Sequence, residues 1–111
     1  MELYEEHCAP IAKGSTPLNP AAVSALASEI PAWALQDSTL TREFVRKDFR
    51  DAMALVNSMA DLAEAEEHHP DIEVSYNKVR LKLSTHKIGG LSRNDFILAA
   101  KIDQIEKKDV T

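Results

Sequence analysis

A change in the phase of hydrophobic alternation between residues 72 and 85 limits what this chain can fold into. The apolar positions are even-numbered first and odd-numbered afterwards: Ile72, Val74 and Tyr76, then Val79, Leu81, Leu83 and Thr85. Side chains alternate between the two faces of a strand, so one straight strand cannot hold both sets on one face. A two-residue turn at Asn77 and Lys78 restores a common face, and the sequence therefore predicts an antiparallel β-hairpin.

This turn predicts a register for the hairpin. The pairs on the apolar face are Tyr76 with Val79, Val74 with Leu81, and Ile72 with Leu83. On the other face Glu73 meets Lys82, a favourable match of charge. Toward the open end the same register places Pro70 opposite Thr85 and His69 opposite His86. Directly opposed residues have Cβ atoms about 4.5–5.5 Å apart, so two histidines distant in sequence are expected to be neighbours.

Three of the four histidines lie in two short clusters, residues 64–70 and residues 84–90. Imidazole titrates near neutral pH, so His68, His69 and His86 could exchange protons with one small molecule. A three-histidine metal site is an alternative, although adjacent histidines are a less favourable ligand spacing. A second alternative is that the histidines lie on the surface near the end of a helix, where positive charge is favourable. The pattern favours a metal-free acid–base pocket, since two segments supply the three imidazoles.

The longest predicted helix begins after Asp48, a plausible N-cap, and leads into the first histidine cluster. Its apolar residues recur at helical spacing: Phe49, Ala52, Met53, Val56, Met59, Ala60 and Ala63. A residue before proline avoids helical angles, so the helix is expected to stop at about His68, with His69 extended. Glu64 lies one helical turn before His68, where its carboxylate could orient the imidazole.

The N-terminal part predicts an arm, a helix and a second hairpin. Residues 1–18 lack a periodic pattern and indicate an irregular arm ahead of a single domain of residues 19–111. Asn19 and Pro20 fit the start of a helix that extends through Ile30 and ends at Pro31. Residues 32–36 and 39–46 are expected to be strands joined by a turn at residues 37–38, and Leu35 faces Leu40 across that turn.

A further helix is predicted after the second histidine cluster. Residues 92–95 fit a capping box in which Asp95 takes the position usually held by Glu, so this carboxylate already has a structural role. Asp95 could also face the histidines. The predicted core face of the helix comprises Phe96, Ala99, Ala100, Ile102 and Ile105.

Composition excludes several classes of function. The 111 residues suffice for one modest domain. Thirteen basic against eighteen acidic residues give a net charge of −5, which disfavours nucleic acid or an anionic membrane as partner. The single Cys8 cannot form an internal disulfide, and His7 with Cys8 offers too few ligands for a metal site. No export signal or membrane span is evident, so a cytoplasmic location is expected.

The spacing of the site residues resembles that of the pterin-4a-carbinolamine dehydratase family, and the similarity runs from about Trp33 to Ile105. The motif residues are Glu64, His68, His69, Pro70, Tyr76, His86 and Asp95. The segments Tyr-Asn-Lys-Val at 76–79, Leu-Ser-Thr-His at 83–86 and Gly-Gly-Leu-Ser at 89–92 extend the match. The similarity therefore covers most of the domain.

The resemblance implies an α+β fold in the order α-β-β-α-β-β-α, with a four-stranded antiparallel sheet covered on one face by helices. It implies a homodimer or homotetramer. It also implies a hydro-lyase that converts 4a-hydroxytetrahydrobiopterin to quinonoid dihydropterin in tetrahydrobiopterin recycling, without a metal or cofactor. Such an elimination removes a ring N–H proton and protonates the departing hydroxyl.

By the same resemblance, His68 and His86 would be the acid–base residues, His69 would mainly contact substrate, and Glu64 would orient His68. The other residues implied to bind substrate are Ser84, Thr85, Asp95, Pro70 and Asp71. Two departures from the family pattern concern Ile72, where an aromatic residue is common, and the lone Cys8 in place of a Cys-rich arm.

A non-catalytic role is the alternative that the resemblance leaves open. Animal members of the family also act as dimerisation partners of a homeodomain transcription factor, and some relatives are assembly proteins. The retained histidines favour the enzyme.

Overall fold

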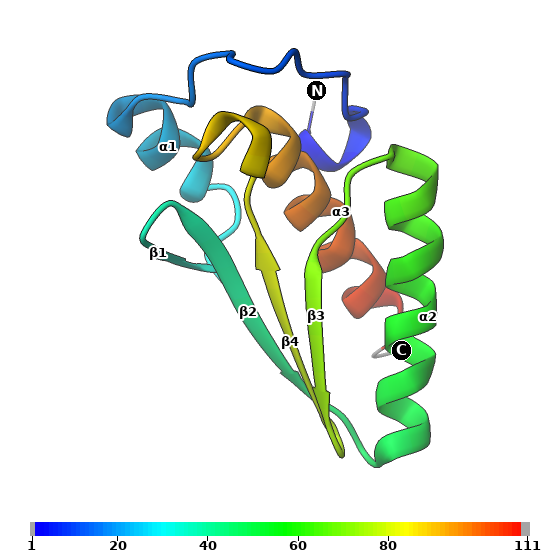
Figure 1. Cartoon of the computed structure of the whole chain (residues 1–111). Coiled ribbons are helices and arrows are strands. Elements are labelled where there is room, and N and C mark those ends of the chain that lie inside the picture. The colour runs from blue at the N-terminus through cyan, green and yellow to red at the C-terminus, as the bar shows by residue number, and fades with distance from the viewer. Residues whose placement is uncertain (1, 110–111) are drawn as a thin grey trace.

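The computed structural model describes residues 2–109. Within these residues the chain forms three α-helices and four strands, with a short 3₁₀-helix in the N-terminal arm and another after the last strand. Figure 1 shows their arrangement. The elements are η1 (Leu3–Glu5), α1 (Pro20–Ala27), β1 (Ala34–Gln36), β2 (Thr39–Val45), α2 (Phe49–Glu66), β3 (Asp71–Ser75), β4 (Lys78–Leu83), η2 (His86–Ile88) and α3 (Arg93–Asp109).

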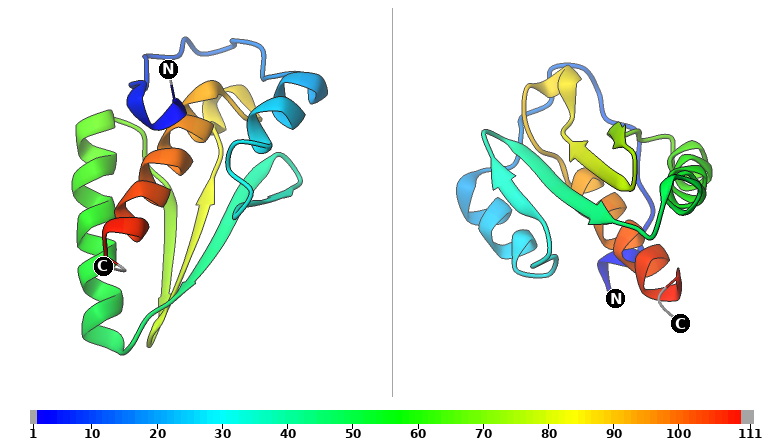
Figure 2. Two further views of the ribbon diagram at one scale, coloured as in Figure 1. Left: turned by 180° about the vertical axis from the view of Figure 1, so that it is seen from behind. Right: turned by 90° about the horizontal axis from the view of Figure 1, so that it is seen from below.

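The four strands form one antiparallel sheet in the order β1-β2-β4-β3. Helices α2 and α3 pack against one face of it (Figure 2), and alternate residues of β4 enter the core between these layers. The predicted α+β class, with its order of helices and strands, is confirmed. This arrangement brings the end of α2, the end of β4 and the start of α3 to the same end of the molecule (Figure 1).

The predicted register of the hairpin β3–β4 is wrong by two residues. Ile72 pairs with Leu81, and Val74 pairs with Val79, so the turn lies at residues 76–77 rather than 77–78. A shift of two keeps the same side chains on the apolar face, which is why alternation alone could not distinguish the two registers.

The predicted opposition of His69 and His86 fails with that register. The β3 strand begins only at Asp71, and His86 starts the 3₁₀-helix η2 after β4 has ended. Thr85 forms a bridge with Gly90 instead of pairing with Pro70. The polar face also differs from the prediction, because Glu73 lies opposite Arg80 rather than Lys82. Nζ of Lys82 is 4.0 Å from Oε1 of Glu73.

The tip of this hairpin is held by the loop after β2. The Arg46 amide donates to the Asn77 carbonyl at 2.7 Å, and the Asn77 side chain donates to the Arg46 carbonyl at 2.9 Å. With Asn77 fixed in this way, Tyr76 takes the position of positive φ, at +53°. A left-handed conformation is unfavourable for a residue with a Cβ.

We expect Tyr76→Gly to raise the free energy of unfolding by about 0.5–1 kcal/mol, because glycine adopts positive φ without the Cβ clash. The Tyr76 side chain is exposed, so its removal costs little packing. Urea denaturation of the two proteins measures the difference. Ser75→Gly, within β3, is the control and is expected to destabilise. A loss of stability in Tyr76→Gly would contradict the prediction.

The second hairpin follows the sequence prediction closely. Leu35 pairs with Leu40, as expected, and the turn residues Asp37 and Ser38 both have positive φ, as a type I′ turn requires. The strands are shorter than the predicted 32–36 and 39–46. They begin at Ala34 and end at Val45.

The helices begin where the sequence predicts, but two of them end earlier. The Asn19 side chain caps α1 by accepting the Ala22 amide, and α1 ends at Ala27, short of the predicted Ile30. The Asp48 side chain caps α2 by accepting the Asp51 amide. Helix α2 ends at Glu66, two residues before the predicted end at His68, because Glu67 adopts a left-handed C-cap conformation.

The core lies between the sheet and helices α2 and α3. Of the predicted apolar positions of α2, Ala52, Met59 and Ala63 are buried, but Phe49 and Ala60 are exposed. Leu55, which was not predicted, is buried. Helix α3 is buried on more than one face, since Ile97 and Leu98 are in the core beside the predicted residues. No helix within residues 2–109 is long and apolar enough to cross a membrane.

Candidate active site

His68 leaves the end of α2 and points at the start of α3. Its Nε2 lies 2.6 Å from Oδ1 of Asp95, and the side chains of His68 and Asp95 are 12% and 0% exposed. A carboxylate oxygen is a hydrogen-bond acceptor, and Nε2 can donate to it in the tautomer that carries its hydrogen there. The left-handed Glu67 produces this arrangement, because it turns the chain out of the helix one residue before His68.

A buried network holds Asp95. Its second oxygen, Oδ2, accepts the Thr85 hydroxyl at 2.9 Å and the Ser92 amide at 3.0 Å, and the hydroxyls of Thr85 and Ser92 are 2.7 Å apart. The bond to the Ser92 amide is the one that the predicted capping box requires. Asp95 therefore fixes the start of α3 and the orientation of the His68 imidazole at the same time.

Glu64 pairs with the other histidine of this cluster, contrary to the prediction. Its Oε2 lies 2.5 Å from Nε2 of His69, and both side chains are largely exposed, at 78% and 58%. The i,i+4 relation to His68 fails because the helix ends at Glu66. Asp95, rather than Glu64, is the carboxylate that orients His68.

His86 lies at the exposed end of the sheet. Its Nε2 is 4.0 Å from Oδ2 of Asp71, the first residue of β3, and its side chain is 81% exposed. Ser84 and Pro70 are half-buried residues that flank the ends of β4 and β3. His69 follows His68 in the chain and His86 follows β4, but both side chains are exposed, whereas that of His68 is largely buried.

A cavity of about 270 Å³ adjoins His68. Of the nine predicted site residues, only His68 and Thr85 line it. The complete lining is Cys8, Ala9, Pro10, Ile11, Glu66, Glu67, His68, Thr85, Lys87 and Asn94. The arm residues were missed because an aperiodic segment carries no signal of what it packs against, whereas Glu66 and Lys87 stand beside motif residues in the sequence.

Glu66 binds the arm at this cavity. Its Oε1 accepts the Cys8 amide at 2.7 Å, and its Oε2 lies 2.9 Å from Nδ1 of His7 and 3.8 Å from Nζ of Lys101. Burial opposes ionisation, but the hydrogen bonds from Cys8 and His7 outweigh it and lower the pKa of Glu66. Burial, together with the charge of Glu66, raises the pKa of the Cys8 thiol to about 12.

The lowered pKa of Glu66 predicts that acid loosens the arm. The ionised carboxylate stabilises the docked arm above the ordinary pKa of 4.5, and this contribution is lost as the pH falls through the lower folded-state value. Hydrogen exchange at the Cys8 amide, corrected for its intrinsic pH dependence, should show less protection below that pH. Equal protection at pH 6 and at pH 3 would contradict the prediction, and Glu66→Gln is expected to remove this step.

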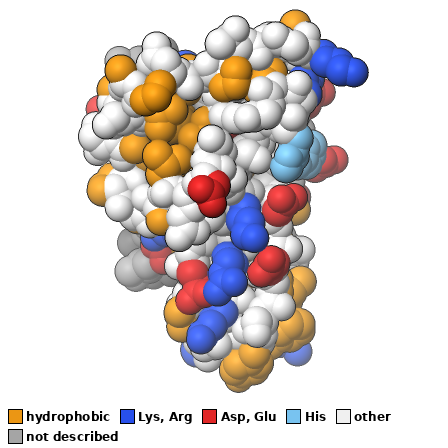
Figure 3. Space-filling view, turned by 60° about the vertical axis from the view of Figure 1, so that its left-hand side comes forward, with side chains coloured by type: hydrophobic (Ala, Val, Ile, Leu, Met, Phe, Trp, Pro, Cys, Tyr) orange, Lys and Arg blue, Asp and Glu red, His pale blue; other side chains and the backbone are white. Residues whose placement is uncertain are grey.

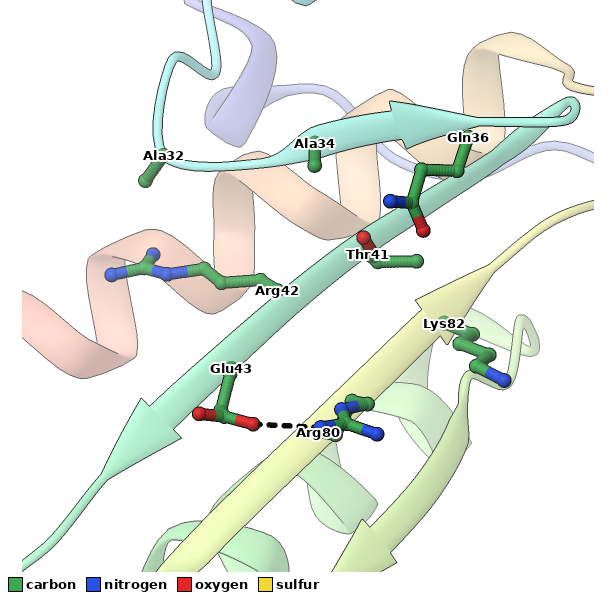
Figure 4. Close-up of a pocket in the computed structure, with 8 residues that line it drawn as sticks. All are labelled: Ala32, Ala34, Gln36, Thr41, Arg42, Glu43, Arg80 and Lys82. Carbon is green, nitrogen blue, oxygen red and sulfur yellow. Dashed lines mark hydrogen bonds and ion pairs between the residues drawn. The ribbon is translucent and has the colours of Figure 1, made fainter.

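A larger hollow lies on the opposite face of the sheet. Figure 3 shows a row of basic side chains flanked by acidic ones there, and the hollow measures about 480 Å³. In Figure 4 Arg80 bonds to Glu43, at 3.0 Å, and Arg42 points away toward α3. No histidine is among the eight lining residues, which include three basic side chains and one carboxylate, so this hollow offers no imidazole for acid–base chemistry near neutral pH.

Known proteins share both the sequence and the fold. A sequence profile of the family described as pterin 4 alpha carbinolamine dehydratase matches residues 16–105. The chain belongs to this family. A Thermomicrobium roseum protein provisionally named pterin-4-alpha-carbinolamine dehydratase is 47% identical over 88 residues, which cover 79% of this chain and 95% of that protein.

Other members of the pterin 4 alpha carbinolamine dehydratase family match more of the chain. A Nitrosospira multiformis protein of the same provisional name is 40% identical over 104 residues, 94% of this chain and 92% of the relative. The crystal structure of a transcriptional coactivator/pterin dehydratase from Brucella melitensis superposes with a TM-score of 0.76 at 29% identity, covering 81% of this chain and 98% of that one.

Proposed function

We propose that this protein dehydrates pterin-4a-carbinolamine to quinonoid dihydropterin by histidine acid–base catalysis, as a hydro-lyase of tetrahydrobiopterin recycling. The observation that carries the proposal is the His68–Asp95 pair, 2.6 Å apart, at the wall of a cavity of about 270 Å³. A histidine oriented by a buried carboxylate suits proton transfer. Family membership and the names of the relatives support the pterin substrate.

The reaction needs one proton removed and another delivered. The ring N–H bond of the carbinolamine breaks as a base takes its proton, the electron pair forms a C=N bond, and the C–O bond breaks as an acid protonates the departing hydroxyl to water. Because Asp95 holds Nε2 of His68, Nδ1 is the nitrogen that would meet the substrate. His68 and His86 are proposed as the two proton-transfer groups, with His69 as a substrate contact.

The remaining predicted site residues have supporting parts in this proposal. Thr85 and Asp95 would hold the buried side of the site, and Glu64, Pro70, Asp71 and Ser84 would shape its exposed rim. Two imidazoles can serve as acid and base without a metal. Within residues 2–109, no three His, Cys, Asp or Glu side chains are grouped so as to hold a metal ion.

Ultraviolet monitoring of carbinolamine decay, with and without the protein, tests the proposal. We expect faster decay in proportion to protein concentration, together with formation of the quinonoid dihydropterin. Decay at the uncatalysed rate would overturn the proposed activity. Full activity after removal of metal by chelators is expected too, and loss of activity with restoration by zinc would overturn the metal-free mechanism.

A binding role without catalysis is the second candidate. The Brucella melitensis structure is described as a transcriptional coactivator as well as a pterin dehydratase, which supports this alternative. Either role fits a proposed homodimer or homotetramer, because large apolar side chains are exposed at Val45, Phe49 and Tyr76. An inactive protein that is oligomeric by light scattering would favour the binding role.

A further inference from the structure

The N-terminal arm is tied to each of the three segments that carry the proposed site. Figure 1 shows the arm crossing the end of the molecule where α2 ends and α3 begins. Glu66, two residues before His68, accepts the Cys8 amide at 2.7 Å. Lys87, next to His86, donates to the Ile11 carbonyl at 2.9 Å. The arm thus spans both histidine clusters.

The third tie comes from Asn94, the neighbour of Asp95. Its side-chain amide pairs with the peptide groups of Ala9 in both directions: Oδ1 accepts the Ala9 amide at 3.0 Å, and Nδ2 donates to the Ala9 carbonyl at 2.7 Å. One residue earlier, Arg93 donates to both carboxylate oxygens of Glu6, at 2.8 and 2.7 Å. Two consecutive side chains at the start of α3 therefore bind the arm.

The cavity beside His68 has two unlike walls. The arm contributes the side chains of Cys8, Ala9, Pro10 and Ile11, which are apolar or, in the case of the Cys8 thiol, uncharged at neutral pH. The opposite wall contains polar and charged side chains, among them His68, Thr85 and Asn94. A planar heterocycle with a polar edge and an apolar face matches such a cavity, whose volume lies near the lower limit for small-molecule sites.

We infer that residues 8–11 of the arm form the specificity wall of the substrate cavity, with Ile11 contacting the apolar part of the pterin and Asn94 positioning the arm. This inference rests on the proposed function. Contact with the substrate in both the bound and the reacting state lowers KM without changing kcat, since such binding is uniform. A group that served folding alone would leave both constants unchanged once the protein is folded.

Ile11→Ala tests the wall. The substitution keeps the carbonyl that Lys87 binds and removes only apolar side-chain contact. We expect KM for the carbinolamine to rise about 3- to 10-fold, with kcat within about twofold of the parent. Leu35→Ala is the matched control, an apolar truncation at a side chain that is 48% exposed on β1, at the edge of the sheet opposite β3. An unchanged KM in Ile11→Ala would overturn the inference.

Asn94→Ala tests the positioning of the arm, since it removes both bonds to Ala9. We expect KM to rise about tenfold, as the loss of two hydrogen bonds suggests. The dissociation constant of dihydrobiopterin, measured by calorimetry, should rise in parallel in both variants. Should Asn94→Ala not fold, Ile11→Ala still decides the inference.

Failure of the inference and failure of the proposed function give different results. A parent protein that dehydrates the carbinolamine, with Ile11→Ala at parental KM, overturns the arm as a wall and leaves the function standing. A parent that binds dihydrobiopterin without catalysis, and binds it more weakly after Ile11→Ala, overturns the function alone. A parent that neither catalyses nor binds overturns both.

Discussion

His68→Gln is expected to lower kcat by about 10²- to 10⁴-fold, the usual contribution of a positioned acid–base group. The glutamine amide can still donate to Asp95, so the buried carboxylate keeps a partner at this position. The variant should therefore fold and retain the circular dichroism spectrum of the parent. Steady-state kinetics on the carbinolamine, with protein concentration corrected for folded fraction, measure the effect.

His69→Gln is the matched comparison, since it makes the same change at an adjacent but exposed imidazole. We expect a smaller effect, mainly on KM, because His69 pairs with Glu64 outside the buried network. The assignment of proton transfer to His68 fails if folded His68→Gln keeps parental kcat, or if His69→Gln loses more activity than His68→Gln does.

Asp95→Ala should combine the largest loss of stability with a loss of activity. The substitution leaves the Ser92 amide, the Thr85 hydroxyl and the His68 ring without the acceptor that they share. Removing a fully buried acceptor that several donors share is expected to lower the free energy of unfolding by about 2–4 kcal/mol. Urea denaturation at neutral pH measures this change. We expect kcat to fall as well, since the imidazole of His68 loses its orientation.

Asp61→Ala provides the control, because Asp61 is an exposed carboxylate on α2. Its replacement should change the free energy of unfolding by no more than about 0.5 kcal/mol. Asp95→Asn separates the two effects: it keeps the volume and one acceptor oxygen, so we expect it to be more stable than Asp95→Ala while kcat stays low. Equal stability of Asp95→Ala and the parent would contradict the role given to this network.

The fold could be predicted largely from local patterns, but the exact pairing of the β3–β4 hairpin could not. Alternation determines which side chains share a face, and a register shifted by two residues satisfies it equally well. The choice was made by a non-local contact, the pair of hydrogen bonds between Asn77 and Arg46. The turn at Asp37 and Ser38 carries no comparable ambiguity, and its register was predicted correctly.

The segments that carry the predicted site residues lie at one end of the molecule, but the side chains pair differently from the prediction. Proline at position 70 indicated that α2 ends nearby, but the left-handed Glu67 ends it early enough to separate Glu64 from His68. Asp95 was expected as a cap, and its second contact, with His68, depends on how α2 and α3 pack. The arm's place beside the cavity depends on the same tertiary packing, which spacing along the chain does not encode.

The arm's contacts also imply an order of assembly. The bonds of Cys8 and Ala9 to Glu66 and Asn94 join residues 58 and 85 positions apart, whereas Thr85 and Asp95 are separated by only 10. Closing a longer loop costs more entropy, and docking the arm requires α2 and α3 to be packed already. The proposed proton-transfer centre should therefore form first during folding, and the arm should dock last and detach first.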